Sequence, residues 1–231
     1  MILITLIAFL IIAIITSCFI KCNGIQSYII KAPNQSSQLK TLILATTHGN
    51  EPAGFFALHR YIDSNPNIKK GTITIIPAVN SCGKYANQRN NPLGDFDINR
   101  SYPNHTLLNS QLTKLIDKSD WVIDLHEGFD YHKMNPSSIG SGIYPGNTQK
   151  AKYLAQELVS KINTTITDPN KEFVTMQLNG IRGSLRDYCN KHNKNYILVE
   201  TSGINDIQDI KIRVNQQEII INNIASKLHN N

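Results

Sequence analysis

The chain has 231 residues, of which 41% are hydrophobic and 17% are charged, so it is large enough for one domain with a full core and does not have the composition of a disordered or coiled-coil protein. Its 23 Lys and Arg outnumber its 17 Asp and Glu, for a formal net charge of +6, but the basic residues are scattered and do not alternate with aromatics, so we expect no nucleic-acid partner. The four cysteines include no CxxC pair, which excludes a thiolate-type zinc site and does not indicate a disulfide framework.

Residues 2–20 form an apolar run, ILITLIAFLIIAIITSCFI, without a charged side chain. Its length lies between that of a signal-peptide core and that of a membrane-spanning helix. No basic side chain precedes the run and Lys21 follows it, which argues against export of what comes after; a buried soluble helix is the third alternative. We expect a signal peptide or membrane anchor over 1–23, and therefore an exported or membrane-anchored protein with possible membrane association through residues 2–20. A linker with a first strand (24–40) and a single catalytic domain (41–231) follow.

Beyond this run, short apolar segments rich in β-branched residues alternate with amphipathic segments. In chain order we expect a strand at 41–46, a helix that begins at Pro52, a strand at 71–79, a long loop at 80–103, a helix at 110–118, a strand at 121–125, helices at 148–162 and 184–190, a strand at 196–199 and a helix at 207–228. This alternation predicts an α/β fold with a mostly parallel (mixed) central sheet and helices on both faces. Ligands of such folds bind beyond the carboxyl ends of the strands.

Two polar clusters at predicted strand ends contain metal-binding side chains. His48 and Glu51 are three residues apart in THGNEPAG, and His126 follows the strand WVIDL. Imidazole and carboxylate are standard zinc ligands, and three such ligands plus a water make up a catalytic zinc site. Asp124, on the same face of its strand as His126, could orient the imidazole, whereas Glu127 points to the opposite face. Each cluster taken alone also fits a turn histidine or a glutamate favoured by a helix dipole.

Two further clusters contain side chains suited to acid–base and anion chemistry. Glu200 directly follows the apolar segment YILV, where burial would raise its pKa toward that of a general base; a capping or salt-bridged glutamate is the alternative. In the loop RNNPLGDFDINRSYP, Arg100 beside Asn99 could grip a substrate carboxylate, and Arg89 could stabilise an oxyanion. By composition alone the segment is an Asn-rich loop with two ordinary arginines.

Taken in order, these four clusters resemble the zinc carboxypeptidase superfamily, and they are most similar to its succinylglutamate desuccinylase and aspartoacylase branch. The similarity runs from about Thr41 to Gly203 and carries several separate motifs in the right order. It implies one Zn²⁺ per chain, held by the HxxE…H ligands His48, Glu51 and His126.

The same resemblance implies roles for the remaining clusters. Arg89 would polarise the substrate carbonyl, and Asn99 with Arg100 would clamp the substrate's carboxylate. Glu200 would activate water and later protonate the leaving amine. Arg186 stands near the position that lines the specificity pocket of the peptidases and suggests an acidic substrate side chain; an exposed helix arginine is the alternative, and Arg182 is the second choice for this role.

The sequence departs from the family pattern in two respects that bear on substrate choice. It has few residues between the zinc motifs, so we expect a smaller cover over the active site. The peptidases carry a substrate-contacting tyrosine before the segment that holds the catalytic glutamate, and this chain has no tyrosine between Tyr153 and Tyr188. The resemblance therefore leaves open which group, if any, takes that role.

We expect a zinc-dependent hydrolase that cleaves an amide bond next to a free carboxylate, as an N-acyl amino acid deacylase does. A small zinc carboxypeptidase or peptide amidase remains an alternative, because HGNEPAG and VETSG favour the deacylase branch while RNNPLGDFDINRSYP is typical of peptidases. The partner would be a small-molecule or peptide substrate with a free carboxylate. The alternative from another class is a catalytically inactive, membrane-tethered binding module.

Overall fold

The computed structural model describes residues 7, 22, 24–33 and 37–230. The predicted signal or anchor run therefore lies almost wholly outside the described residues. Among those that are described, no helix is both long and apolar enough to cross a membrane.

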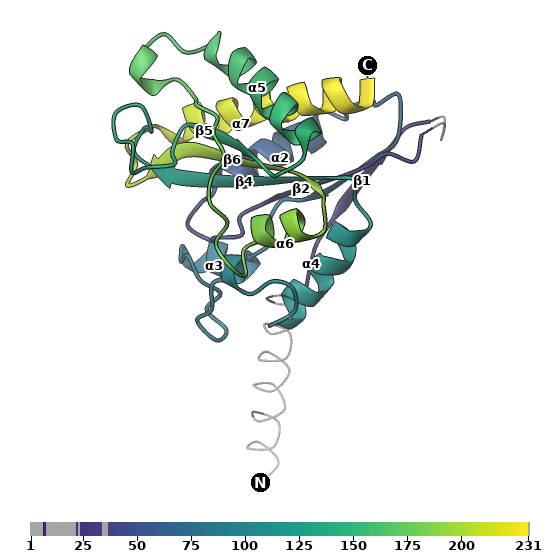
Figure 1. The fold of residues 1–231 in the computed structure, drawn as a ribbon. Helices are drawn as coiled ribbons and strands as arrows, with labels where there is room; N and C mark the ends of the chain where they lie inside the picture. The colour runs from purple at the N-terminus through teal and green to yellow at the C-terminus, as the bar shows by residue number, and fades with distance from the viewer. Residues whose placement is uncertain (1–6, 8–21, 23, 34–36, 231) are drawn as a thin grey trace.

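A six-stranded mixed sheet forms the centre of the domain, as Figure 1 shows. The strands are β1 (Tyr28–Lys31), β2 (Lys40–Ala45), β3 (Thr72–Ile76), β4 (Trp121–Phe129), β5 (Gly142–Pro145) and β6 (Asn195–Ile204), in the spatial order β1-β3-β2-β4-β6-β5. The four central strands are parallel, while β1 and β5 run antiparallel at the two edges. The predicted mixed, mostly parallel α/β sheet is confirmed.

Helices cover both faces of the sheet (Figure 1). One face carries α2 (Ala53–Asp63), α5 (Gln149–Asn163) and α7 (Ile210–Ala225); the other carries α3 (Ser81–Ala86), α4 (Leu107–Asp117) and α6 (Leu185–Lys191). Short helical turns complete the set: η1 (Ile98–Arg100), η2 (Pro169–Lys171) and η3 (Ser226–Asn230). Because neighbouring residues of a strand point to opposite faces, Ile43 belongs to the core under α2, while Leu42 and Leu44 belong to the core under α4 and α6.

Several predicted boundaries are wrong, and most errors occur where polar residues lie inside regular structure. β4 continues through His126 to Phe129, and β6 continues through Glu200 to Ile204, because the two strands stay paired along this length. The short edge strand β5 was not predicted; it ends in Pro145, which an edge strand tolerates. Helix α3 lies inside the predicted loop 80–103, where the Asn80 side chain caps it by accepting a hydrogen bond from the Gly83 backbone N–H.

A disulfide joins Cys22 to Cys82, with a Cα–Cα distance of 5.2 Å. Cysteine number and spacing did not indicate this bond, because the two residues are 60 positions apart and meet only in the folded chain. It links the segment that follows the apolar run covalently to α3. Cys189 is free and buried in the core.

A buried ion pair ties α7 to β4 and to the start of α2. Glu127, next to His126, accepts a hydrogen bond from Arg213 of α7 and another, at 2.6 Å, from the backbone N–H of Ala53 at the start of α2. Both charged side chains are almost fully buried. Glu127 thus points away from the predicted metal ligands, as its place in the strand predicts, and fixes the helix that follows Glu51.

Replacing Arg213 with Ala is expected to lower the free energy of unfolding by about 3–5 kcal/mol, because it leaves the Glu127 carboxylate buried without its cation. Urea unfolding of the purified protein measures this change. Arg60→Ala is the matched control, since its ion pair with Glu218 is solvent-exposed and is worth at most about 1 kcal/mol. Equal losses of unfolding free energy in the two variants would show that the buried ion pair of Arg213 stabilises the protein no more than an exposed one.

Candidate metal and catalytic site

Three predicted ligands converge where β2 and β4 approach the start of α2. Nδ1 of His48 and Nδ1 of His126 lie 3.2 Å apart, and each lies 2.7 Å from a carboxylate oxygen of Glu51. All three side chains are buried, and their ligand atoms lie within 4.8 Å of one another. Zinc binds histidine nitrogen at about 2.0–2.1 Å in tetrahedral sites, so donors about 3 Å apart can share one ion. Two imidazoles and a carboxylate fit a zinc ion in both chemistry and spacing.

A close backbone contact holds the loop that carries His48 and Glu51. The Gly49 backbone N–H donates to the Arg89 carbonyl, and a Cβ on Gly49 would lie 2.0 Å from the Gly83 carbonyl carbon of α3. Only glycine allows the loop to pack this closely on α3. Helix α3 therefore supports the ligand loop, and the chain continues from it directly to Arg89.

The far nitrogen of each imidazole faces a carboxylate. Nε2 of His126 lies 3.0 Å from Oδ1 of Asp124, and Nε2 of His48 lies 3.3 Å from Oδ1 of Asp97. Carboxylates in this position fix the tautomer and orientation of metal-binding histidines. The role of Asp124 was predicted. Asp97 was not singled out, although it lies in the segment GDFDINRSYP.

The charges around the three ligands reinforce one another. Burial raises the pKa of Glu51, but the His48 and His126 imidazoles outweigh it and hold this pKa well below its ordinary value. Burial likewise acts against ionisation of Asp97, while His48 and Arg89 lower its pKa overall. Both carboxylates are therefore ionised at neutral pH, as a cation site requires.

Glu200 lies beside this cluster, on the strand next to His126. The β4–β6 register places the two residues directly opposite one another. Glu200 is 5% exposed and contributes to the wall of the same cavity. Burial raises the pKa of its carboxyl group well above the ordinary value, and the Glu51 and Asp124 carboxylates raise it further. A carboxyl group with a raised pKa is suited to accept and return a proton.

The cavity has a volume of about 250 Å³ and collects every predicted site residue: His48, Glu51, Arg89, Asn99, Arg100, His126, Arg186 and Glu200. Phe129, Ile139, Leu178 and Ile181 supply apolar parts of its wall. A cavity with apolar walls and a few convergent polar groups is typical of small-molecule sites.

The residues predicted to contact the carbonyl and the carboxylate of the substrate lie in the loop after α3. Arg89 is partly exposed, with Nη1 3.4 Å from Glu51 Oε1 and Nη2 3.2 Å from Asp97 Oδ2. Asn99 Oδ1 accepts a hydrogen bond from the Leu185 backbone N–H at 2.8 Å, which fixes its side chain and does not use its NH₂ group. Arg100 donates to the Asn99 carbonyl at 2.7 Å and is otherwise exposed.

Arg186 is buried in the cavity wall, so the alternative of an exposed helix arginine is wrong. It is 5% exposed and donates from Nη2 to the Pro145 carbonyl at 2.9 Å. Its Nε and Nη1 atoms are buried without a hydrogen-bond partner, a costly state for a guanidinium. Arg182, the second choice, is exposed and does not line the cavity.

One tyrosine that the motifs did not single out also reaches the cavity. Tyr196 lies in its wall, and the Tyr196 hydroxyl donates to Asp124 Oδ2 at 2.9 Å. From its position inside the predicted strand YILV, Tyr196 was expected only to pack in the core. The hydroxyl thus helps to hold the carboxylate that faces His126.

Comparison with known proteins agrees with this geometry. Residues 37–154, just over half of the chain, match the succinylglutamate desuccinylase/aspartoacylase catalytic domain. No curated protein matches the sequence significantly.

Solved structures show the same fold. Csd4, a cell shape determinant protein of Helicobacter pylori, is 20% identical with a TM-score of 0.75, and the match covers 89% of this chain and 55% of Csd4. Its mDAP-bound form, described as a D,L-carboxypeptidase, is 19% identical with a TM-score of 0.74, and the match covers 87% of this chain and 54% of Csd4. An aspartoacylase family protein from Mesorhizobium loti is 18% identical with a TM-score of 0.64, and the match covers 90% of this chain and 62% of that protein.

The chain spans about half the length of Csd4, and at these identities the structural similarity establishes the fold alone. The family assignment depends instead on the sequence match over residues 37–154. The chain belongs to the succinylglutamate desuccinylase/aspartoacylase family.

Proposed function

We propose that this protein is a zinc-dependent hydrolase that cleaves an amide bond next to a free carboxylate, as an N-acyl amino acid deacylase. The observation that carries the proposal is the convergence of His48, Glu51 and His126 with Glu200 on one cavity. A decayed site would be expected to lack one of these groups, and here all four are buried around the same point.

Zinc held by His48, Glu51 and His126 would supply Lewis acidity toward a water and toward the scissile carbonyl. Glu200 takes the proton of the attacking water, for which its raised pKa suits it. It then gives the proton to the nitrogen of the leaving amine. The products are a carboxylic acid and a free amine.

The loop arginines complete the reaction geometry. Arg89, with its guanidinium at the rim of the ligand cluster, hydrogen-bonds the oxygen that becomes negative as the carbonyl is attacked. Asn99 and Arg100 bind the substrate carboxylate, and the bond from the Leu185 N–H holds the Asn99 amide for this contact. Losing one oxyanion donor costs on the order of 100-fold in kcat.

Arg186 gives the site its preference for an acidic substrate side chain. Its Nε and Nη1 atoms lack partners in the protein, and a carboxylate is the group that matches an arginine fork best. Substrates derived from aspartate or glutamate are therefore preferred over neutral ones.

Arg186→Gln is expected to reduce kcat/KM for N-acyl-aspartate or N-acyl-glutamate by about 10–100-fold, the value of a hydrogen bond to a charged group, and to change kcat/KM for N-acyl-alanine much less. Initial rates on the two substrate classes measure the difference. Arg182→Gln is the control, because Arg182 is exposed and outside the cavity wall. A uniform loss on both classes would remove Arg186 from substrate selection.

A small carboxypeptidase is the second candidate, and the fold similarity to Csd4, a D,L-carboxypeptidase, favours it. A panel of N-acyl amino acids and short peptides with free or amidated C-termini separates the two activities. Release of free acid from the N-acyl amino acids supports the deacylase, and release of a C-terminal residue supports the carboxypeptidase. Zinc binding without turnover on the whole panel would favour the binding module.

A further inference from the structure

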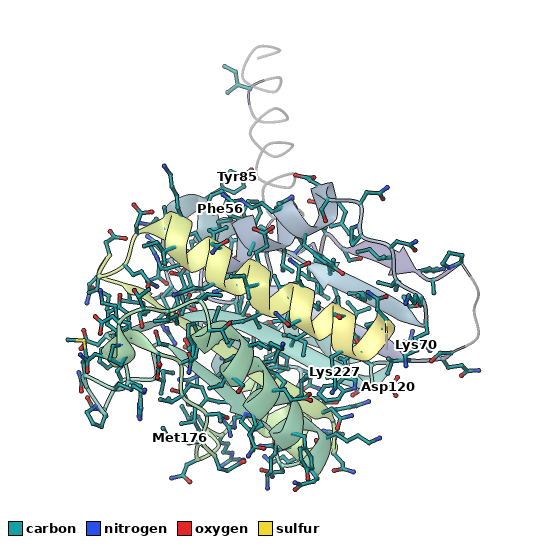
Figure 2. All side chains as sticks on the ribbon, turned by 90° about the horizontal axis from the view of Figure 1, so that it is seen from above. Phe56, Lys70, Tyr85, Asp120, Met176 and Lys227 are labelled. Carbon is teal, nitrogen blue, oxygen red and sulfur yellow. A yellow bond between two sulfur atoms is a disulfide. The ribbon has the colours of Figure 1, made fainter. Side chains whose placement is uncertain are left out.

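A group of aromatic side chains lies on the surface beside the disulfide. We call the residues Phe55, Phe56, Lys84 and Tyr85 the α2–α3 aromatic surface. Figure 2 shows Phe56 and Tyr85 near one another, and these two are 45% and 89% exposed. The Lys84 ammonium lies 3.9 Å from the centre of the Phe55 ring, 5.6 Å from that of Tyr85 and 6.0 Å from that of Phe56. One cation and three rings thus form a continuous cluster, in which Phe56 and Tyr85 are exposed and Phe55 and Lys84 are half-buried.

The disulfide fixes Cys22, two positions after the apolar run, next to this surface. Residues 2–20 end two positions before Cys22, and Cys22 is bonded to Cys82 of α3. Tyr85 follows Cys82 by three residues in the same helix, which is about 4.5 Å along the helix axis. Cys22, which follows in sequence an apolar segment long enough to insert into a membrane, is therefore bonded to the helix that carries Tyr85.

The chemistry of the surface is that of a membrane interface. Aromatic rings, tyrosine above all, favour the boundary between lipid headgroups and hydrocarbon. Lysine places its stem along apolar surface and its ammonium among the headgroups, where anionic lipid attracts it. Lys21, at the end of the apolar run, adds a second positive charge near this point of the chain.

We propose that the α2–α3 aromatic surface rests on the headgroups of a lipid bilayer into which residues 2–20 insert. The bilayer then touches the domain where α2 and α3 come together. Helix α3 is also the helix against which the loop of His48 and Glu51 packs through Gly49. Membrane contact thus orients the whole domain instead of leaving it on a free tether.

The full chain, reconstituted into vesicles of phosphatidylcholine and phosphatidylglycerol, tests this orientation through the Tyr85→Trp variant. The chain has one tryptophan, Trp121, which is buried and gives a constant background. The indole at position 85 is expected to be quenched at least about twofold by brominated lipids and to shift its emission to the blue, as amphipathic rings do at the interface. Tyr153→Trp is the matched control, because Tyr153 is 62% exposed on α5 and does not belong to the α2–α3 aromatic surface.

Three outcomes would overturn the proposal. The indole at position 85 could be quenched no more than the one at position 153. It could shift to the blue with rising protein concentration but without quenching by bromolipid, which would assign the surface to a second copy of the chain. The chain could also fail to associate with the vesicles. Because position 85 is almost fully exposed, the substitution leaves the fold intact, and unchanged emission from Trp121 checks this.

Discussion

Glu200→Gln is expected to lower kcat by about 10²–10⁴-fold, the contribution of a positioned general acid–base group, while zinc content stays the same. The amide has nearly the shape of the carboxyl group but can neither accept the proton of water nor return it to the leaving amine. Glu200 is not one of the three clustered ligands, so its loss leaves the zinc site complete. Steady-state rates on an N-acyl amino acid and zinc analysis of the same sample measure both quantities.

The matched control is Glu157→Gln, which removes a carboxylate from an exposed ion pair with Lys227, neither of which lines the cavity. Its turnover should equal that of the parent protein. Wild-type turnover in the Glu200 variant would remove Glu200 from the mechanism and leave the zinc site intact. Loss of zinc together with turnover would instead make Glu200 part of the metal site.

The His48–Glu51–His126 cluster could be predicted from the sequence because each residue lies at or near the end of an apolar strand. In a parallel sheet, such positions meet at one edge, so HxxE after β2 and the histidine in β4 converge without detailed knowledge of the loops. Glu200 could be predicted for the same reason. The strand ends themselves were misplaced, since His126 and Glu200 face each other inside the paired β4 and β6.

The features that sequence did not reveal depend on contacts between distant segments. Arg186 lies on a short helix whose local pattern fits either burial or exposure, and only its packing against the Pro145 carbonyl decides between them. Asp97 contacts His48 across 49 positions, and Cys22 bonds Cys82 across 60. No local periodicity encodes pairs of this kind.

The same long-range contacts connect the site with the surface proposed to face lipid. Cys82 belongs to α3, and Gly83 of that helix packs against Gly49 in the ligand loop. The chain leaves α3 toward Arg89, whose carbonyl accepts the Gly49 N–H. The disulfide thus holds Cys22 to the helix on which the ligand loop packs.

His126→Ala is expected to reduce bound zinc from about one ion per chain to nearly none and to abolish hydrolysis, because a catalytic zinc site needs its three protein ligands in addition to water. In this variant Glu51 keeps only one of its two imidazole partners. Zinc is measured by elemental analysis of protein dialysed against a weak chelator, and thermal unfolding of the same sample confirms that the variant is folded.

His192→Ala serves as the matched histidine control, because His192 is exposed and stacks on Tyr188 away from the cavity. Asp124→Asn should fall between the two, with zinc affinity about 10–100-fold weaker, since it removes the carboxylate that faces the His126 imidazole. This graded order of zinc affinity ties the metal to the observed geometry. A folded, zinc-supplemented wild-type protein that holds no zinc would exclude the hydrolase mechanism, and a His126 variant that keeps its zinc would place the ion elsewhere.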